Sequence, residues 1–202
     1  MSLTLLLGGC YGTSTVYRGA DADALQGRTV VMLESTRLPP FSADGYEKIV
    51  ARVERALASS PDIPRLISRK DMKERGDIPL ATRNNYKLLS NSISLLGVVN
   101  PELSSRLGLD LNAQLLSSIH LSFLPCSACE EGDQLWMVGQ VVSAGTGKVL
   151  LRTHHGVPVE SSDEAQLLEV AEELAANFLL EAKSAFHRKW HRQRFEHLRP
   201  AS

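Results

Sequence analysis

Three cysteines are the residues of this chain best suited to chemistry, and two of them form a Cys-x-x-Cys motif, Cys126 and Cys129. Such a motif serves as a redox pair, a structural disulfide or half of a metal site. In a redox enzyme it opens a helix whose dipole lowers the thiol pKa. Here Pro125 precedes it and two glutamates follow it, and negative neighbours raise a thiol pKa instead. The motif therefore favours a structural disulfide in an oxidising compartment.

A different use of Cys126 and Cys129 stays open: a soluble thiol–disulfide or metal-binding protein. That alternative predicts a free pair of thiols with a lowered pKa and an intracellular location. A metal site of this kind needs two further ligands, and the sequence contains no second Cys-x-x-Cys motif. We expect neither a metal nor a cofactor.

The third cysteine, Cys10, ends the sequence Leu7-Gly8-Gly9-Cys10, which follows a short apolar run. An apolar run, two small residues and a cysteine are the pattern of a bacterial lipoprotein signal, in which this cysteine carries the lipid after cleavage. The run is short and lacks a basic residue, which a start codon placed too far downstream would explain; the alternative is an ordinary apolar N-terminus with a chance cysteine. The pattern predicts lipid attachment at Cys10.

Other groups with suggestive spacing predict no catalytic site. His187 and His191 share a helix face, but their surroundings are basic and repel a cation. His154 and His155 are adjacent on an expected strand, so they face opposite ways. Gly145–Lys148 lacks the spacing and the following helix of a phosphate-binding loop. No Gly-x-Ser-x-Gly is present, and we expect that the protein is not an enzyme.

The expected strands and helices alternate along the chain. Two strands, 135–143 and 148–157, form a hairpin around Ala144-Gly145-Thr146-Gly147, where glycine supplies the positive-φ positions of a tight turn. Apolar residues at helical spacing follow from Leu167 to Ala182. Earlier patterns predict strands over 28–35, 65–68 and 114–123, and helices over 44–57, 86–96 and 101–107, the last one ending at Gly108. The charged stretch 69–79 is expected at the surface.

Length and composition fit one folded domain. The chain has 202 residues, of which 43% are hydrophobic and 22% charged, with a net charge of −1. With this net charge, the protein has no overall positive field that would attract nucleic acid. The basic C-terminal stretch contains no recognised nucleic-acid-binding module. We therefore predict a tether over 11–27, an α/β domain over 28–182 and a basic helical extension over 183–202.

This order of elements resembles bacterial envelope lipoproteins whose domain is similar to the N-terminal domain of TolB. Curli-secretion lipoproteins, lipoprotein activators of penicillin-binding proteins and the Pel exopolysaccharide lipoprotein share it. The resemblance rests on the following stretches: Leu7–Cys10, Thr29–Leu33, Tyr46–Leu57, Leu115–Phe123, Trp136–Val157 and Leu167–Leu180. It implies a single α/β domain with a mixed sheet of four or five strands, packed helices and a long C-terminal helix.

The resemblance also implies a role. We expect a lipid-anchored lipoprotein on the periplasmic face of the outer membrane, acting as a structural or assembly component of a secretion, export or motor complex. Members of this architecture form rings, so self-association is expected as well. The expected contact to a partner or to a neighbouring copy is the basic, aromatic stretch from Phe186 to Leu198. It contains Phe186, Arg188, Trp190, Arg192 and Phe195, and arginines beside aromatic residues are typical of interface hot spots.

Overall fold

The computed structural model describes residues 13–18, 28–34, 42–61, 63–125, 132–159 and 164–187. The strands and helices follow in this order: β1 (Thr13–Arg18), β2 (Thr29–Met32), α1 (Ala43–Ala58), β3 (Arg65–Ile67), α2 (Arg69–Glu74), α3 (Leu80–Leu96), α4 (Pro101–Leu111), β4 (Leu115–Leu124), β5 (Asp133–Ser143), β6 (Val149–Val159) and α5 (Glu164–His187). The α/β class, the mixed sheet and the long C-terminal helix are confirmed.

The sheet has six strands in the order β1-β6-β5-β4-β2-β3. β2 is parallel to β3, as the strand–helix–strand crossover through α1 requires, and it is also parallel to β4. The pairs β4–β5, β5–β6 and β6–β1 are antiparallel. The predicted count of four or five strands was therefore too low. The additional strand is β1, which lies inside the stretch predicted to be a tether and pairs with β6 along its whole length.

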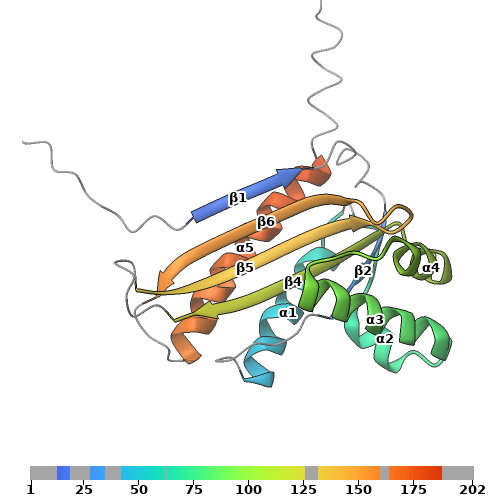
Figure 1. Cartoon of the computed structure of the whole chain (residues 1–202), viewed down its shortest axis with the longest axis horizontal. Coiled ribbons are helices and arrows are strands. Elements are labelled where there is room, and N and C mark those ends of the chain that lie inside the picture. Colours follow the sequence, from blue (N-terminus) through green and yellow to red (C-terminus); the bar gives the residue numbers. More distant parts are fainter. Residues whose placement is uncertain are drawn as a thin grey trace, which may run out of the picture.

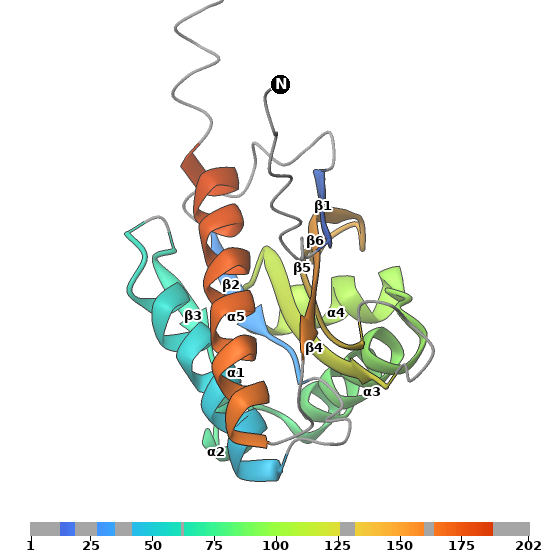
Figure 2. The same cartoon turned by 90° about the vertical axis from the view of Figure 1, so that its left-hand side faces the viewer.

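Helices cover the two faces of the sheet unequally (Figures 1 and 2). On one face, α1 and α5 bury a large apolar cluster that includes Ile49, Ile119 and Phe178. On the other face, α3 and α4 bury a smaller cluster that includes Leu89, Leu107 and Leu116. In Figure 1, α3 and α4 lie over one end of the sheet, so no described helix covers the rest of that face.

Residue Gly108 corrects one predicted boundary. It lies inside α4, which continues to Leu111 and ends at Asn112 with a positive φ of 48°. A Cβ at position 108 would lie 2.7 Å from the Cβ of Ala144. Glycine is therefore required where α4 contacts the β5–β6 turn, and it does not end the helix.

The turn itself is close to the predicted one. Gly147 has a φ of 68°, and a Cβ there would lie 3.0 Å from the Cα of Pro101 at the start of α4. The Ser104 hydroxyl donates to the Ala144 carbonyl at 2.8 Å, and the Ala144 amide donates to the Gln114 carbonyl at 2.9 Å. These contacts fix the β5–β6 turn against α4.

Candidate binding surfaces

The residues that the sequence predicted to carry function lie mostly outside the described residues. This holds for Cys10, Cys126 and Cys129, so the lipid attachment and the disulfide both stay predictions. It holds as well for Arg188, Trp190, Arg192 and Phe195 of the extension, whereas Phe186 lies in the last turn of α5 with its side chain outside the description. The described part of the chain offers two other surfaces.

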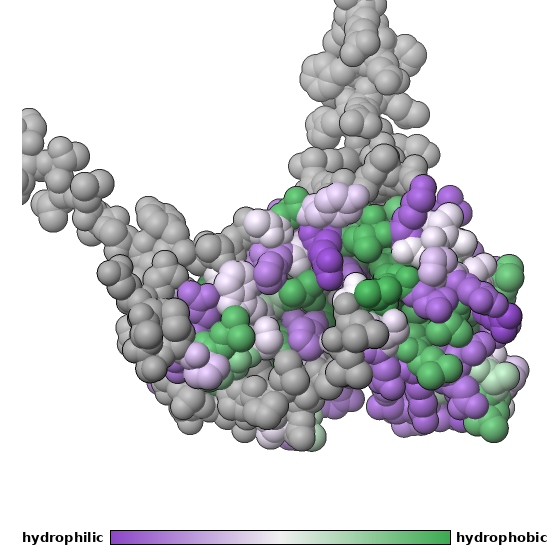
Figure 3. All heavy atoms as spheres, viewed as in Figure 1, coloured by the Kyte–Doolittle hydropathy of each residue, from purple (hydrophilic) through white to green (hydrophobic). Residues whose placement is uncertain are grey.

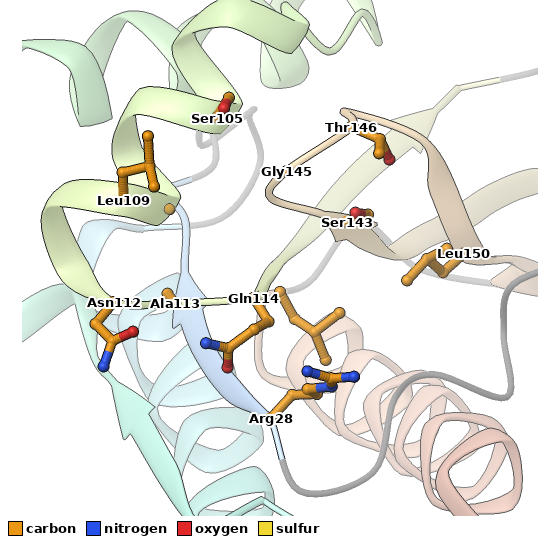
Figure 4. Close-up of a pocket in the computed structure, with 12 residues that line it drawn as sticks. Arg28, Ser105, Leu109, Asn112, Ala113, Gln114, Ser143, Gly145, Thr146 and Leu150 are labelled. Carbon is orange, nitrogen blue, oxygen red and sulfur yellow. The ribbon is translucent and has the colours of Figure 1, made fainter.

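The first surface is a pocket between the end of α4, the start of β4 and the β5–β6 turn, shown in Figure 4. Its volume is about 480 Å³, within the range of small-molecule sites. Leu115 and Leu150 form an apolar floor, and Leu109, which is 79% exposed, lies at the rim. Polar groups come from Ser105, Asn112, Gln114, Ser143 and Thr146.

Arg28 is the one charged residue among the described residues that line this pocket. It comes directly before β2, and Gln114 holds that strand start in place, since its Oε1 accepts from the Thr29 amide at 2.9 Å. A single cation with several hydroxyl and amide groups around an apolar floor can hold a small polar or anionic group. Segments far apart in the sequence build the pocket, so no local motif predicts it.

The second surface is the part of the sheet that no described helix covers, which we call the open face. Two cross-strand rows of β4, β5, β6 and β1 form most of it: His120–Val138–His154–Thr15 and Ser122–Trp136–Gly156–Thr13. In the adjoining row, Ser118 and Gln140 are buried beside the end of α3, whereas Arg152 and Tyr17 are exposed. The alternation of polar and apolar residues in β4 predicted its Ser118–His120–Ser122 side. In the space-filling view, hydrophilic and hydrophobic residues are interspersed over this side of the molecule (Figure 3).

An aromatic pair lies on the open face. The Trp136 ring lies across Gly156, where a Cβ would come within 2.5 Å of it, and its centroid is 4.5 Å from that of His154 at an interplanar angle of 37°. Because position 156 is a glycine, the indole can lie flat on the strand beside the imidazole. The pair gives the face a broad, partly apolar contact area.

A small cavity adjoins the open face below the end of α3. It measures about 120 Å³ and is lined by Gln140, Ser118, His120 and Arg152, among others. The Gln140 Oε1 and the His120 Nδ1 are buried and have no hydrogen-bond partner among the described residues. The Arg152 guanidinium lies close to Gly97 at the C-terminal end of α3, where a positive charge complements the helix dipole. The cavity has room for a small polar group or for several water molecules.

Two histidines within the sheet should make stability depend on pH. Burial lowers the pKa of His120 and of His155, and for His155 the nearby Glu181 opposes that shift. The unfolded chain then binds protons that the folded chain does not, below the ordinary histidine pKa of about 6.5. We expect the free energy of unfolding to be highest above about pH 7 and to fall as the pH decreases through about 6.

Urea denaturation at several pH values measures this dependence. Replacing both histidines, His120→Gln and His155→Gln, should flatten the profile over this range. An unchanged slope in the double variant would show that other groups cause the dependence.

Neither a metal site nor a membrane-spanning helix is found in the described part of the chain. No group of three or more histidine, cysteine, aspartate or glutamate side chains there could hold a metal ion. Among the same residues, every helix is too short or too polar to cross a bilayer.

No protein-family model matches the chain, and no curated protein matches it. Among solved structures, a PelC dodecamer from Paraburkholderia phytofirmans is similar at 16% identity and a TM-score of 0.45, over 84% of this chain and 95% of that chain. A hypothetical protein from Chlamydia trachomatis is similar at 12% identity and a TM-score of 0.45, over 79% and 98%. A lipoprotein from Neisseria meningitidis is similar at 12% identity and a TM-score of 0.40, over 74% and 97%.

These structures thus include a PelC protein, which is one of the types that the sequence resembles. At such identities and TM-scores, the similarities establish neither a family nor a function for this chain.

Proposed function

We propose that this protein is a lipid-anchored lipoprotein of the cell envelope, held at the periplasmic face of the outer membrane. The observation that carries the proposal is the sequence Leu7-Gly8-Gly9-Cys10 directly before the folded domain. β1 begins at Thr13, three residues after Cys10. Cleavage before Cys10 would therefore leave the whole described domain intact, with the lipid-bearing cysteine at its start.

Within the envelope, we assign the protein a structural or assembly role without enzymatic activity. General acid–base or nucleophilic catalysis needs a positioned base next to the reacting group. The described residues that line the α4 pocket include one charged group, Arg28, and no carboxylate, histidine or cysteine. A lining of this kind suits the binding of a small polar group. The proposed role is that of a component of a secretion, export or motor complex.

The Cys10→Ala substitution tests the anchor. We expect the unaltered protein to sediment with membranes and to be released by detergent, and the variant to appear in the soluble fraction of the envelope. The melting temperatures of the two proteins serve as the control for folding. Membrane association that persists without Cys10 would contradict the proposed anchor.

The basic extension is the proposed contact to a partner or to a neighbouring copy, through Phe186, Trp190 and Phe195 with Arg188 and Arg192. Deleting residues 186–202 leaves the described core residues of α5 in the chain, among them Leu174, Phe178 and Ala182. The truncated protein should keep a cooperative melt, while the apparent mass of the assembly falls or the complex is no longer recovered.

Size-exclusion chromatography with light scattering measures the mass of the assembly, and pull-down from solubilised membranes measures the complex. The full-length Trp190→Ala, Phe195→Ala variant is the matched control, because it should lose the same contact without shortening the chain. Loss of the cooperative melt in the truncated protein would show instead that the segment belongs to the core.

A further inference from the structure

The predicted lipid attachment lies very close to one edge of the sheet. Two residues, Tyr11 and Gly12, separate Cys10 from Thr13 in the sequence, and an extended chain over these three steps spans at most about 10 Å. β1 is an edge strand that pairs only with β6, starting at Thr13 opposite Gly156. A lipid on Cys10 therefore holds this end of β1 near the bilayer surface.

Such a tether permits two orientations of the domain. In the first, the domain stands end-on, and the end of the sheet that carries Leu124, Asp133 and the start of α5 faces the bilayer. In the second, the domain lies flat, and the whole of β1 faces the bilayer together with the C-terminal end of α5. Figures 1 and 2 show that end of α5 at the same side of the molecule as β1.

The distribution of charge distinguishes the two orientations. Residues 160–181 contain seven acidic and no basic residues, and Glu130, Glu131 and Asp133 add further negative charge around the β4–β5 connection. Residues 183–199 contain six lysines and arginines against one acidic residue. Anionic lipid headgroups attract basic segments and repel acidic ones. The end-on orientation brings the acidic start of α5 to the bilayer, whereas the flat orientation brings Glu181 together with the end of α5 from which the basic stretch follows. The charge therefore favours the flat orientation.

Exposed apolar side chains favour the same orientation. Val16 is 40% exposed and Tyr17 is 56% exposed, both on β1, and Leu180 is 65% exposed in the last two turns of α5. Tyrosine is enriched at membrane interfaces, where its ring lies at the level of the headgroups. These residues can enter the headgroup region when the edge lies along the bilayer.

We propose that the edge formed by β1 and the C-terminal end of α5 lies flat on an anionic phospholipid surface, with Val16, Tyr17 and Leu180 in contact with it. This inference rests on the proposed lipid attachment at Cys10.

Site-directed spin labelling of the lipidated full-length chain tests the orientation. In a background with Cys126→Ser and Cys129→Ser, single labels are placed through Tyr17→Cys, Leu180→Cys, Leu124→Cys or Lys70→Cys. The protein is reconstituted in vesicles of phosphatidylethanolamine and phosphatidylglycerol, and in vesicles of phosphatidylcholine. We expect the labels at positions 17 and 180 to collide less often with a water-soluble nickel chelate when the protein is bound to vesicles. This decrease should be larger in the anionic vesicles than in those of phosphatidylcholine.

The label at position 124 reports the competing end-on orientation. The label at position 70, an exposed residue of α2, is the control that should stay accessible. Protection at 124 with exposure at 17 would overturn the inference in favour of the end-on orientation. Exposure at all four positions would overturn it too. Dipolar broadening at position 17 in the absence of lipid would also overturn it, because a second copy would then cover the edge.

Mass spectrometry of the same sample separates the two claims. A chain without lipid would refute the proposed anchor and this inference together, whereas a lipidated chain with label 17 exposed would refute the inference alone.

Discussion

The Phe178→Ala substitution should lower the free energy of unfolding by about 4 kcal/mol. Phe178 is fully buried in α5, and its ring lies directly on the backbone of β5 at Gly139. Removal of the ring deletes the contact between the long helix and the centre of the sheet and leaves a cavity. Urea denaturation followed by circular dichroism measures the loss.

Residue Gly139 provides a second measurement of the same contact. A Cβ at position 139 would lie 2.2 Å from the Phe178 ring, so Gly139→Ala should destabilise the native protein by about 2 kcal/mol through overpacking. In the Phe178→Ala background the same change should cost much less, with a coupling of about 1 kcal/mol or more. Gly76→Ala is the matched control, because no atom lies within 4 Å of its added Cβ. Additive effects of the two substitutions would show that ring and glycine do not touch.

The Arg69→Ala substitution should cost about 3 kcal/mol. The Arg69 side chain is only 7% exposed, and its guanidinium donates to Glu47 at 2.6 Å and to Glu54 at 3.2 Å. Burial alone would lower the pKa of Arg69, but the pairing with Glu54 and Glu47 raises it above the ordinary arginine value. The side chain is therefore charged, and its removal leaves the largely buried Glu54 carboxylate without its counter-charge.

Thermal and urea denaturation check the value. Replacing both members of the Arg69–Glu54 pair, by Arg69→Met with Glu54→Leu, should lower the free energy of unfolding less than Arg69→Ala does, because no buried charge is then left unpaired. Arg106→Ala removes the exposed pair with Glu102 and should change the free energy of unfolding by less than about 1 kcal/mol. If Arg69→Ala were as mild as Arg106→Ala, the buried pair would not join α2 to α1.

The sequence predicted those elements whose pattern is local. The strands of the β5–β6 hairpin, the two-residue alternation of β4 and the apolar stripe of α5 all carry their period within one segment. β1 carries no such pattern in Thr13–Arg18. Its pairing partner, β6, lies more than 130 residues away in the sequence, so only the assembled sheet reveals it.

Residues 69–79 show the same limitation. The stretch looked like a charged surface segment, yet Arg69, Met72 and Ile78 are buried. A capping box at Ser68 and Asp71 opens α2 there, and the carboxylates that pair with Arg69 come from α1. Pairing with α1 therefore accounts for the burial of Arg69, while Met72 and Ile78 are buried in the smaller apolar cluster of the sheet.

The candidate surfaces could be predicted only in part. The polar side of β4 was visible in its alternation, whereas the Trp136–His154 pair and the α4 pocket depend on strand register and on contacts between distant segments. The residues for which the sequence predicted function, from Cys10 to Phe195, lie at the chain ends and in one loop. Their roles come from motif and composition, and they stay predictions.

Mass spectrometry of the N-terminal peptide tests the central claim most directly. The protein is expressed in a Gram-negative host and isolated from the outer membrane, and its N-terminal peptide is sequenced. The proposal predicts that the mature chain begins at Cys10 and that this residue carries the mass of covalently attached acyl chains. An unmodified Cys10 within an uncleaved N-terminus, in protein that is correctly located, would contradict the claim that the chain is a lipid-anchored component of the envelope.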